Sequence, residues 1–154
     1  MSKHIDSFIA ACEIGDLNRT MQIQRLLYRS DHLARHNAAF MKACKNGHAD
    51  IVEYLLTLRP EIPVFCREHA AFKLACRGNH VHVVEILSSK YEPNSRVMLE
   101  IALAYNMNTD VILHLIYKYG LLGEDEFYDD HCRSRYNRII AKINLPQPKS
   151  AAKV

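Results

Sequence analysis

The stretch AAFMKACKNGHADIVEYLL, residues 38–56, carries the clearest structural pattern in the sequence. Phe40 is followed three and four positions later by the small residues Ala43 and Cys44, so all three side chains lie on one face of a helix. Gly47 suits the positive φ at which a helix often ends. Beyond it, the apolar residues at the spacing of a buried helical stripe are Ile51, Val52, Leu55 and Leu56. The pattern predicts two short helices separated by a turn, and neither helix can bury its stripe alone.

The same pattern recurs with a period of 32 residues. Three columns align at this spacing: the phenylalanines Phe8, Phe40 and Phe72, the alanines Ala11, Ala43 and Ala75, and the cysteines Cys12, Cys44 and Cys76. A fixed period of this size is the signature of stacked repeats, in which each unit buries its stripe against its neighbours. We therefore predict an all-α helical-repeat solenoid in a single domain, residues 1–145, with helix-pair repeats at about 5–34, 35–66, 67–93 and 94–123.

The first and fourth copies depart from the pattern. We expect Asp6 to cap the first helix. We also expect three extra residues before the second helix of the first copy, whose core residues are then Ile23, Leu26 and Leu27. The fourth copy has one extra residue and carries the larger Leu103 in the column of small residues. In the third and fourth copies, the residues at the turn position of Gly47 are Asn79 and Asn106.

A C-terminal capping helix is predicted after the fourth copy, over about 124–145. One face of this segment is apolar and contains Cys132, Tyr136, Ile139, Ile140 and Ile143. The residues outside that face are Arg133, Arg135, Arg138 and Lys142. A terminal unit of a solenoid needs such a polar outer face. From Pro146 to Val154 no periodicity remains, and we expect a loose tail over 146–154.

The composition is that of a folded protein without extreme charge. The 154 residues include 49 % hydrophobic and 24 % charged residues, which excludes disorder as the main state. The net charge of +3 is too small to indicate a nucleic-acid binder. No apolar run is long enough for a membrane span or a signal peptide. The five cysteines are odd in number and contain no Cys-x-x-Cys pair, so we expect reduced thiols in the cytoplasm.

The repeat unit resembles an ankyrin repeat, whose period is about 33 residues. The resemblance rests on Ala43-Cys44, Gly47-His48, Ile51-Val52 and Leu55-Leu56, and it covers roughly residues 5–120. The Thr-Pro-Leu-His opening of the family is missing, and Ala38-Ala39-Phe40-Met41 and Ala70-Ala71-Phe72-Lys73 stand in its place. The resemblance implies an ankyrin-type solenoid of about four divergent repeats, whose β-hairpin fingers are irregular or only loops. Such degenerate copies resemble those of intracellular bacteria and large viruses, which would make the cytosol of a host cell the alternative location.

The resemblance implies a protein–protein interaction module, such as an adaptor, a scaffold or an inhibitor. Ankyrin proteins generally bind other proteins through the finger loops and through the concave groove, which is lined by the first helix of each repeat. We expect a monomer that binds a partner protein and needs no cofactor or metal ion. We expect neither nucleic acid nor a membrane as the partner. A structural subunit of a larger complex is an alternative.

Cations occupy several of the expected groove and finger positions. Lys3, Arg35 and Arg67 are spaced by 32 residues and are expected just before the first helices. Glu13 and Glu68 interrupt the row. A basic strip of this kind would accept an acidic segment of a partner, and the alternative is an ordinary solvated face. We expect Lys45 and Arg77 at the groove-facing ends of the first helices, and His36, His69 and Arg96 in nearby loops. The residues predicted to bind a partner are Lys3, Arg35, His36, Lys45, Asn46, Arg67, His69, Arg77, Arg96 and Tyr105.

The case for a metal site or an enzyme rests on cysteine and histidine. The spacings Cys66-x-x-His69 and Cys76-x-x-x-His80 are similar to those of zinc sites. However, Cys76 and His80 stand in the same repeat columns as Cys44 and His48. They are therefore explained as a packing residue and a turn residue. The sequence contains no phosphate-binding glycine loop, nucleophile elbow or His-Glu-x-x-His motif. We expect no enzymatic activity. The alternative is a Cys/His-dependent enzyme that uses Cys66 or Cys132, which the columns do not explain.

Overall fold

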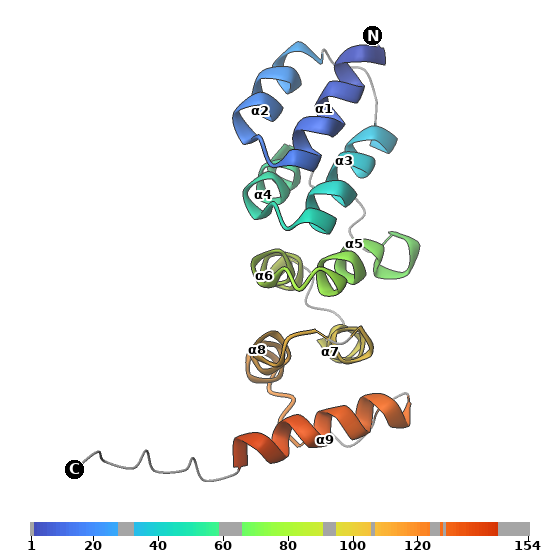
Figure 1. Ribbon diagram of the computed structural model, residues 1–154, viewed down its shortest axis with the longest axis vertical. Helices are drawn as coiled ribbons and strands as arrows, with labels where there is room; N and C mark the ends of the chain where they lie inside the picture. Colours follow the sequence, from blue (N-terminus) through green and yellow to red (C-terminus); the bar gives the residue numbers. More distant parts are fainter. Residues whose placement is uncertain are drawn as a thin grey trace, which may run out of the picture.

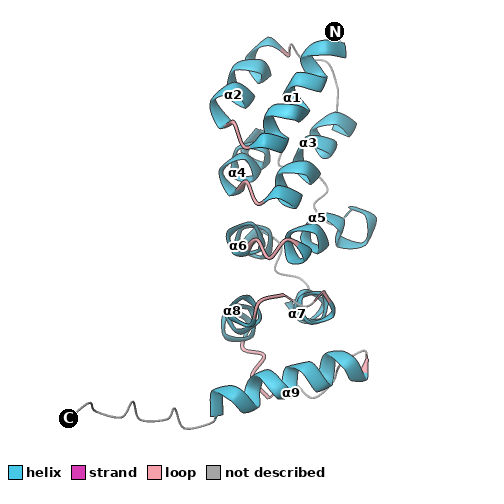
Figure 2. Ribbon diagram, viewed as in Figure 1, coloured by secondary structure: helices cyan, strands magenta, loops and turns pink. Residues whose placement is uncertain are grey.

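The computed structural model describes residues 2–27, 33–58, 66–90, 95–105, 107–123, 127 and 129–144. These residues form helices and turns and contain no strand (Figure 2). The helices are α1 (Ser2–Ile14), α2 (Leu17–Leu26), α3 (Leu33–Asn46), α4 (Ala49–Leu58), α5 (Cys66–Arg77), α6 (Val81–Lys90), α7 (Ser95–Ala104), α8 (Thr109–Tyr119) and α9 (Asp130–Asn144). The predicted all-α fold is confirmed.

The helices stack in two layers. Helices α1, α3, α5 and α7 form the first layer, and α2, α4, α6 and α8 form the second layer beside it (Figure 1). Each helix of the first layer packs against the next, and α9 packs against α7 at the C-terminal end of the stack. Four helix pairs followed by a capping helix are the arrangement that the repeat pattern predicts.

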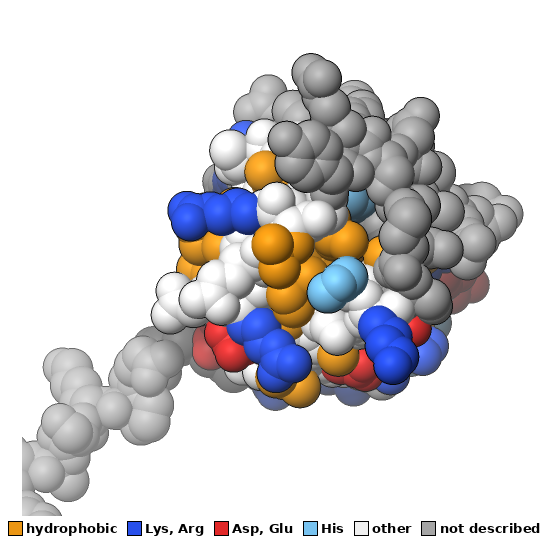
Figure 3. Space-filling view, turned by 90° about the horizontal axis from the view of Figure 1, so that it is seen from above, with side chains coloured by type: hydrophobic (Ala, Val, Ile, Leu, Met, Phe, Trp, Pro, Cys, Tyr) orange, Lys and Arg blue, Asp and Glu red, His pale blue; other side chains and the backbone are white. Residues whose placement is uncertain are grey.

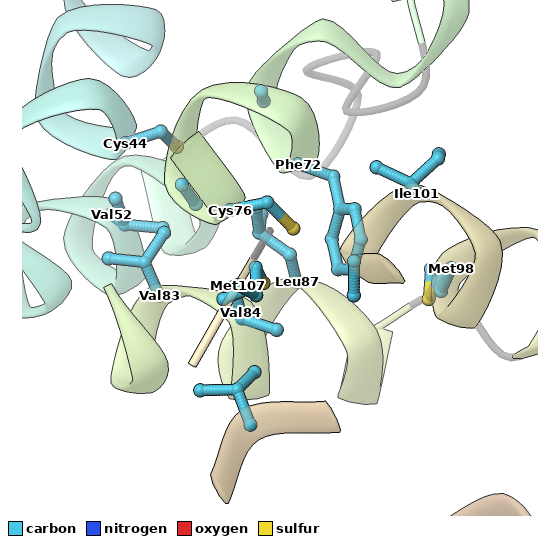
Figure 4. Packing of buried hydrophobic residues seen from close by; sticks show 14 of the residues in the cluster. Cys44, Val52, Phe72, Cys76, Val83, Val84, Leu87, Met98, Ile101 and Met107 are labelled. Carbon is cyan, nitrogen blue, oxygen red and sulfur yellow. The ribbon is translucent and has the colours of Figure 1, made fainter. Parts of the chain in front are cut away.

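The repeated columns form the core between the layers. Phe8, Phe40 and Phe72 are each 1 % exposed. The aligned alanines and cysteines are equally buried, and their small size lets neighbouring helices of the first layer approach closely. In Figure 4, Phe72 lies beside Cys76 of α5 and Leu87 of α6. The columns are therefore a packing requirement that recurs in every repeat.

Each first helix ends with the same backbone hydrogen bond. The residue after the turn donates its N–H to the carbonyl five positions earlier, in the pairs Asp16–Ala11, His48–Ala43, His80–Ala75 and Met107–Ala102, at 3.0 or 3.1 Å. The turn residues have positive φ angles of +85° at Gly15, +80° at Gly47 and +57° at Asn79. This geometry is a Schellman motif, and it confirms the predicted roles of Gly47 and Asn79. Asn106 lies outside the described residues.

The first repeat differs from the sequence prediction. Asp6 lies inside α1, and no insertion precedes α2, because Asp16 caps that helix by accepting a hydrogen bond from the Arg19 N–H at 2.9 Å. Thr20 is consequently buried in the column of Val52. Its hydroxyl donates to the Asp16 carbonyl at 2.7 Å, which satisfies the polar group inside the core. Leu26 is 67 % exposed, so its prediction as a core residue is wrong.

The fourth repeat contains the predicted extra residue in its turn. In the third repeat, the His80 N–H closes the turn after α5, and the His80 carbonyl accepts the first hydrogen bond of α6, from the Val84 N–H. In the fourth repeat, two residues share these roles. The Met107 N–H closes the turn after α7, and the next residue, Asn108, caps α8. Leu103 fits the column of small residues and is fully buried.

The capping helix α9 is shorter than predicted and uses different residues. Tyr136 is buried and stacks on Phe127, with ring centres 4.9 Å apart, a contact that the sequence analysis missed. Ile143 is 37 % exposed, so its prediction as part of the apolar face is wrong. The placement of Arg135 outside the packed face is also wrong, because its guanidinium donates to the Leu103 and Met107 carbonyls.

Some of the predictions concern residues that the structure does not describe. The connections 28–32, 59–65 and 91–94, where finger loops are expected, and the predicted tail 146–154 lie outside the described residues. Among the described helices, none is both long enough and apolar enough to cross a membrane.

Candidate partner-binding surface

The cations expected just before the first helices lie inside them. Lys3 is in the first turn of α1 and is exposed. Arg35 and Arg67 are in the first turns of α3 and α5, and their side chains lie outside the described residues. These helices begin earlier than predicted because no proline or glycine stands within their first turns to end them. The three residues are therefore helix positions rather than loop positions.

His36 was expected in a surface loop, and this placement is wrong. It lies in α3 and is only 4 % exposed. Its Nε2 atom is 3.1 Å from Oε1 of Gln24, and its ring centre is 5.4 Å from that of Phe8. His36 therefore packs the second repeat against the first and does not face a partner.

His69 and Arg96 also lie in helices rather than loops. His69 belongs to α5 and is half-buried, and burial, followed by the nearby Lys73 charge, lowers its pKa. Both effects disfavour the charged form of its imidazole. Arg96 belongs to α7, and its Nε atom is 3.7 Å from Oε1 of Glu100 in the same helix. A ring whose charged form is disfavoured and a cation beside a carboxylate attract an acidic partner less than the sequence analysis assumed.

Lys45 and Arg77 are exposed at the turn ends of α3 and α5, as predicted. The backbone carbonyl of Lys45 accepts a hydrogen bond from Nε2 of His80 at 2.9 Å, which ties this turn to the next repeat. The guanidinium carbon of Arg77 is 5.5 Å from the ring centre of Tyr105, a cation–π contact with the fourth repeat. We call Lys45 and Arg77 the cationic edge. Both residues are exposed, and each is linked to the next repeat, Lys45 through its carbonyl and Arg77 through its side chain.

Two further residues beside this edge have structural partners. Asn46, predicted to bind a partner, donates from Nδ2 to the Glu13 carbonyl at 2.7 Å. The Glu13 carboxylate pairs with Lys42 at 2.7 Å, so this acidic side chain is largely neutralised. The sequence does not predict this role of Lys42, because the equivalent positions of the neighbouring repeats carry no charge. Glu13 stands at the position of Lys45 in the first repeat, so the ion pair with Lys42 reduces the negative charge beside the cationic edge.

The histidines of the turns link successive repeats. Nε2 of His48 lies 3.0 Å from the Glu13 carbonyl, as Nε2 of His80 does from the Lys45 carbonyl. A carbonyl oxygen only accepts, so each ring must carry its proton on Nε2. These residues are therefore explained by the fold, and the part of the chain that the structure describes holds no cluster of three or more metal-ligating side chains.

The N-terminal end of the stack shows apolar side chains beside lysine and arginine side chains (Figure 3). Ile14, at the end of α1, is 65 % exposed. Arg19 is exposed at the column position where Ile51 and Val83 are buried in the following repeats. The charge at Arg19 keeps this end of the stack soluble, as a terminal repeat requires.

The described thiols are buried. Burial raises the pKa of the Cys12 and Cys132 thiols to about 11. Burial also raises the pKa of Cys44 and Cys76 well above the usual range. Because the thiolate is the nucleophile, none of these four cysteines is activated for catalysis. The side chain of Cys66, the other candidate, lies outside the described residues.

We expect iodoacetamide to alkylate Cys12 and Cys132 at neutral pH about 100-fold more slowly in the folded protein than in denaturant, since a raised pKa leaves less thiolate. Cys44 and Cys76 should react more slowly still. Mass spectrometry of peptides resolves each cysteine, and the denatured protein is the control. Rapid alkylation of Cys44 in the folded protein would contradict the burial of this column.

A sequence model of the ankyrin-repeat family, described as ankyrin repeats in three copies, matches residues 8–97. No curated protein and no solved structure matches the sequence. The matched range runs from the middle of α1 through α6 to the start of α7, and the fourth pair continues the same stack. Ankyrin repeats are generally protein–protein interaction modules, and proteins built from them are typically not enzymes. The chain belongs to the ankyrin-repeat family.

Proposed function

We propose that this protein is an adaptor, scaffold or inhibitor that binds a partner protein through the groove side of its first helices. In this proposal, Lys45 and Arg77 contact an acidic segment of the partner. Lys3, Arg35, Arg67 and Arg96, in the first turns of α1, α3, α5 and α7, would add positive charge at the opposite end of this helix layer. The observation that carries the proposal is the cationic edge, in which both cations are exposed, the Lys45 carbonyl is bound by His80 and the Arg77 side chain packs against Tyr105.

The geometry of the edge favours a protein segment with separated carboxylates. Packed helices lie about 8–10 Å apart, so cations at equivalent positions of successive repeats are separated by about the same distance. The guanidinium of Arg77 can bind a carboxylate in a bidentate manner, and Tyr105 holds it in a fixed orientation. A preoriented side chain loses less conformational entropy on binding than a free one. Arg77 is therefore the stronger of the two contacts.

The proposal includes a monomer that acts in the cytoplasm. The four cysteines whose side chains are described are all free thiols, which is typical of a reducing compartment. The large apolar side chains that are exposed among the described residues are few and are Ile14, Leu26, Leu58, Tyr117, Leu122 and Ile143. Both observations support this part of the proposal.

The test is affinity capture from an extract of the source cells, with the purified chain as bait. We expect Lys45→Glu combined with Arg77→Glu to reduce the captured partner about tenfold, because reversed charges slow association and repel an acidic segment. The matched control is Arg19→Glu, an exposed charge reversal at the start of α2. Equal capture by wild type and the double variant, with unchanged helicity, would show that the cationic edge is ordinary surface.

A further inference from the structure

Arg135 of α9 joins the C-terminal helix to the row of turns that carries the cationic edge. Its Nη1 and Nη2 atoms donate to the carbonyls of Leu103 and Met107, the second at 2.6 Å. These two carbonyls flank Tyr105 in the chain, and Tyr105 is the ring against which Arg77 packs. At this last interface Arg135 does what the turn histidines do between earlier repeats. The α9 helix is thereby attached next to Arg77 at the same edge of the stack.

Two further cations follow Arg135 along one side of α9. Arg138 and Lys142 stand three and seven positions after it, a spacing that places the three side chains on one side of a helix. Both are exposed. Burial lowers the pKa of Arg135, and the charge of the nearby Arg138 lowers it further. Like charges at this spacing repel one another, whereas Lys142 in the last turn interacts favourably with the helix dipole.

The acidic side chains described in α9 do not neutralise this row. Asp130 stands in the first turn of the helix, and its carboxylate is 3.7 Å from Arg133. The described part of the chain shows no ion pair to Arg138 or Lys142. Arg138 and Lys142 are exposed, so their charges can attract an anionic group of a partner.

We propose that Arg138 and Lys142 extend the cationic edge onto α9, so that an acidic segment of a partner protein runs from Lys45 past Arg77 to this helix. The inference rests on the proposed function and adds a second half to its surface. With about 10 Å between successive units, the path from Lys45 to α9 covers about 30 Å. An extended chain rises about 3.3 Å per residue, so about nine residues span it, with carboxylates near every third position.

The spacing of the charges favours a polypeptide over a nucleic acid. A nucleic-acid strand carries one phosphate for about every 3.4 Å of its axis, which is denser than these cations. Asp50 and Asp110 also stand in the first turns of α4 and α8, next to the turns. They repel a continuous polyanion but tolerate separated carboxylates. Tyr105 already packs against Arg77 and is not available for base stacking.

The test uses a fluorescent acidic peptide of about twelve residues with glutamate at every third position, and fluorescence anisotropy measures its binding to the full chain. We expect Arg77→Glu and Arg138→Glu each to raise the Kd about threefold to tenfold. The control Arg19→Glu should leave the Kd unchanged, and a peptide with glutamine in place of glutamate should not bind. Circular dichroism checks that each variant keeps its helicity, and Arg138→Gln replaces Arg138→Glu if the reversal unfolds α9.

The outcomes separate the two proposals. If Arg77→Glu weakens binding and Arg138→Glu does not, the surface stops at the fourth repeat, and the extension is wrong while the proposed function stands. If neither variant differs from Arg19→Glu, both proposals are wrong. An oligothymidine of about the same length is the third probe. Tighter binding of this probe than of the peptide, with the same loss in Arg138→Glu, would overturn the assignment to an acidic polypeptide.

Discussion

Replacing Phe40 with alanine is expected to lower the free energy of unfolding by about 3–5 kcal/mol. Phe40 is 1 % exposed in α3, and α3 packs against both α1 and α5. The cavity therefore opens at two interfaces between repeats. In a repeat array these nearest-neighbour interfaces carry much of the stability, so we expect the loss to affect the whole stack. Urea denaturation followed by circular dichroism measures the change.

The control for this prediction is Leu26→Ala. Leu26 is a large apolar residue, but it is 67 % exposed at the end of α2. Its removal should change the free energy of unfolding by no more than about 0.5 kcal/mol. If Phe40→Ala and Leu26→Ala lowered the free energy of unfolding equally, the two residues would be equally buried. That result would contradict the 32-residue register, which places Phe40 in the core.

The repeat columns predict the fold well because they report a packing demand that is the same in each unit. A large aromatic residue and two small ones per helix are needed wherever one first helix packs against the next, as at Phe40, Ala43 and Cys44. The same logic failed in the first repeat. There the core position is taken by Thr20, a polar residue that bonds to its own helix backbone. Side-chain polarity alone does not reveal such a hydrogen bond.

The candidate surface was harder to predict than the core. Lys45 and Arg77 follow the small column residues directly, so their exposure could be read from the helical period. His36 was mistaken for a surface residue because its burial comes from Gln24 and Phe8 of the preceding repeat. The prediction for Arg135 is wrong because the helical period shows on which side of α9 a residue stands, but not which groups of other helices it meets there. The carbonyls that it binds belong to α7 and its turn, more than twenty residues away in the chain.

Replacing Gly47 with alanine is expected to cost about 2–5 kcal/mol, from the backbone and from a clash. Gly47 has a φ of +80°, which a residue with a Cβ atom rarely adopts. The added Cβ would also clash with Nδ1 of His80. That ring cannot simply rotate away, because its Nε2 donates to the Lys45 carbonyl at 2.9 Å. The substitution therefore strains the turn and loosens the contact that positions Lys45.

The matched control is Gly120→Ala, which separates the two contributions. Gly120 has a φ of +64° at the C-cap of α8, and a Cβ there would meet no atom within 4 Å. This variant should lose only the conformational part, about 1–3 kcal/mol. Urea denaturation of both variants gives the difference, which reports the contact with His80. Adding His80→Ala to Gly47→Ala should recover part of that difference by removing the clashing ring. If the two glycine variants lose the same stability and His80→Ala recovers none of it, the turn histidine does not hold the second and third repeats together.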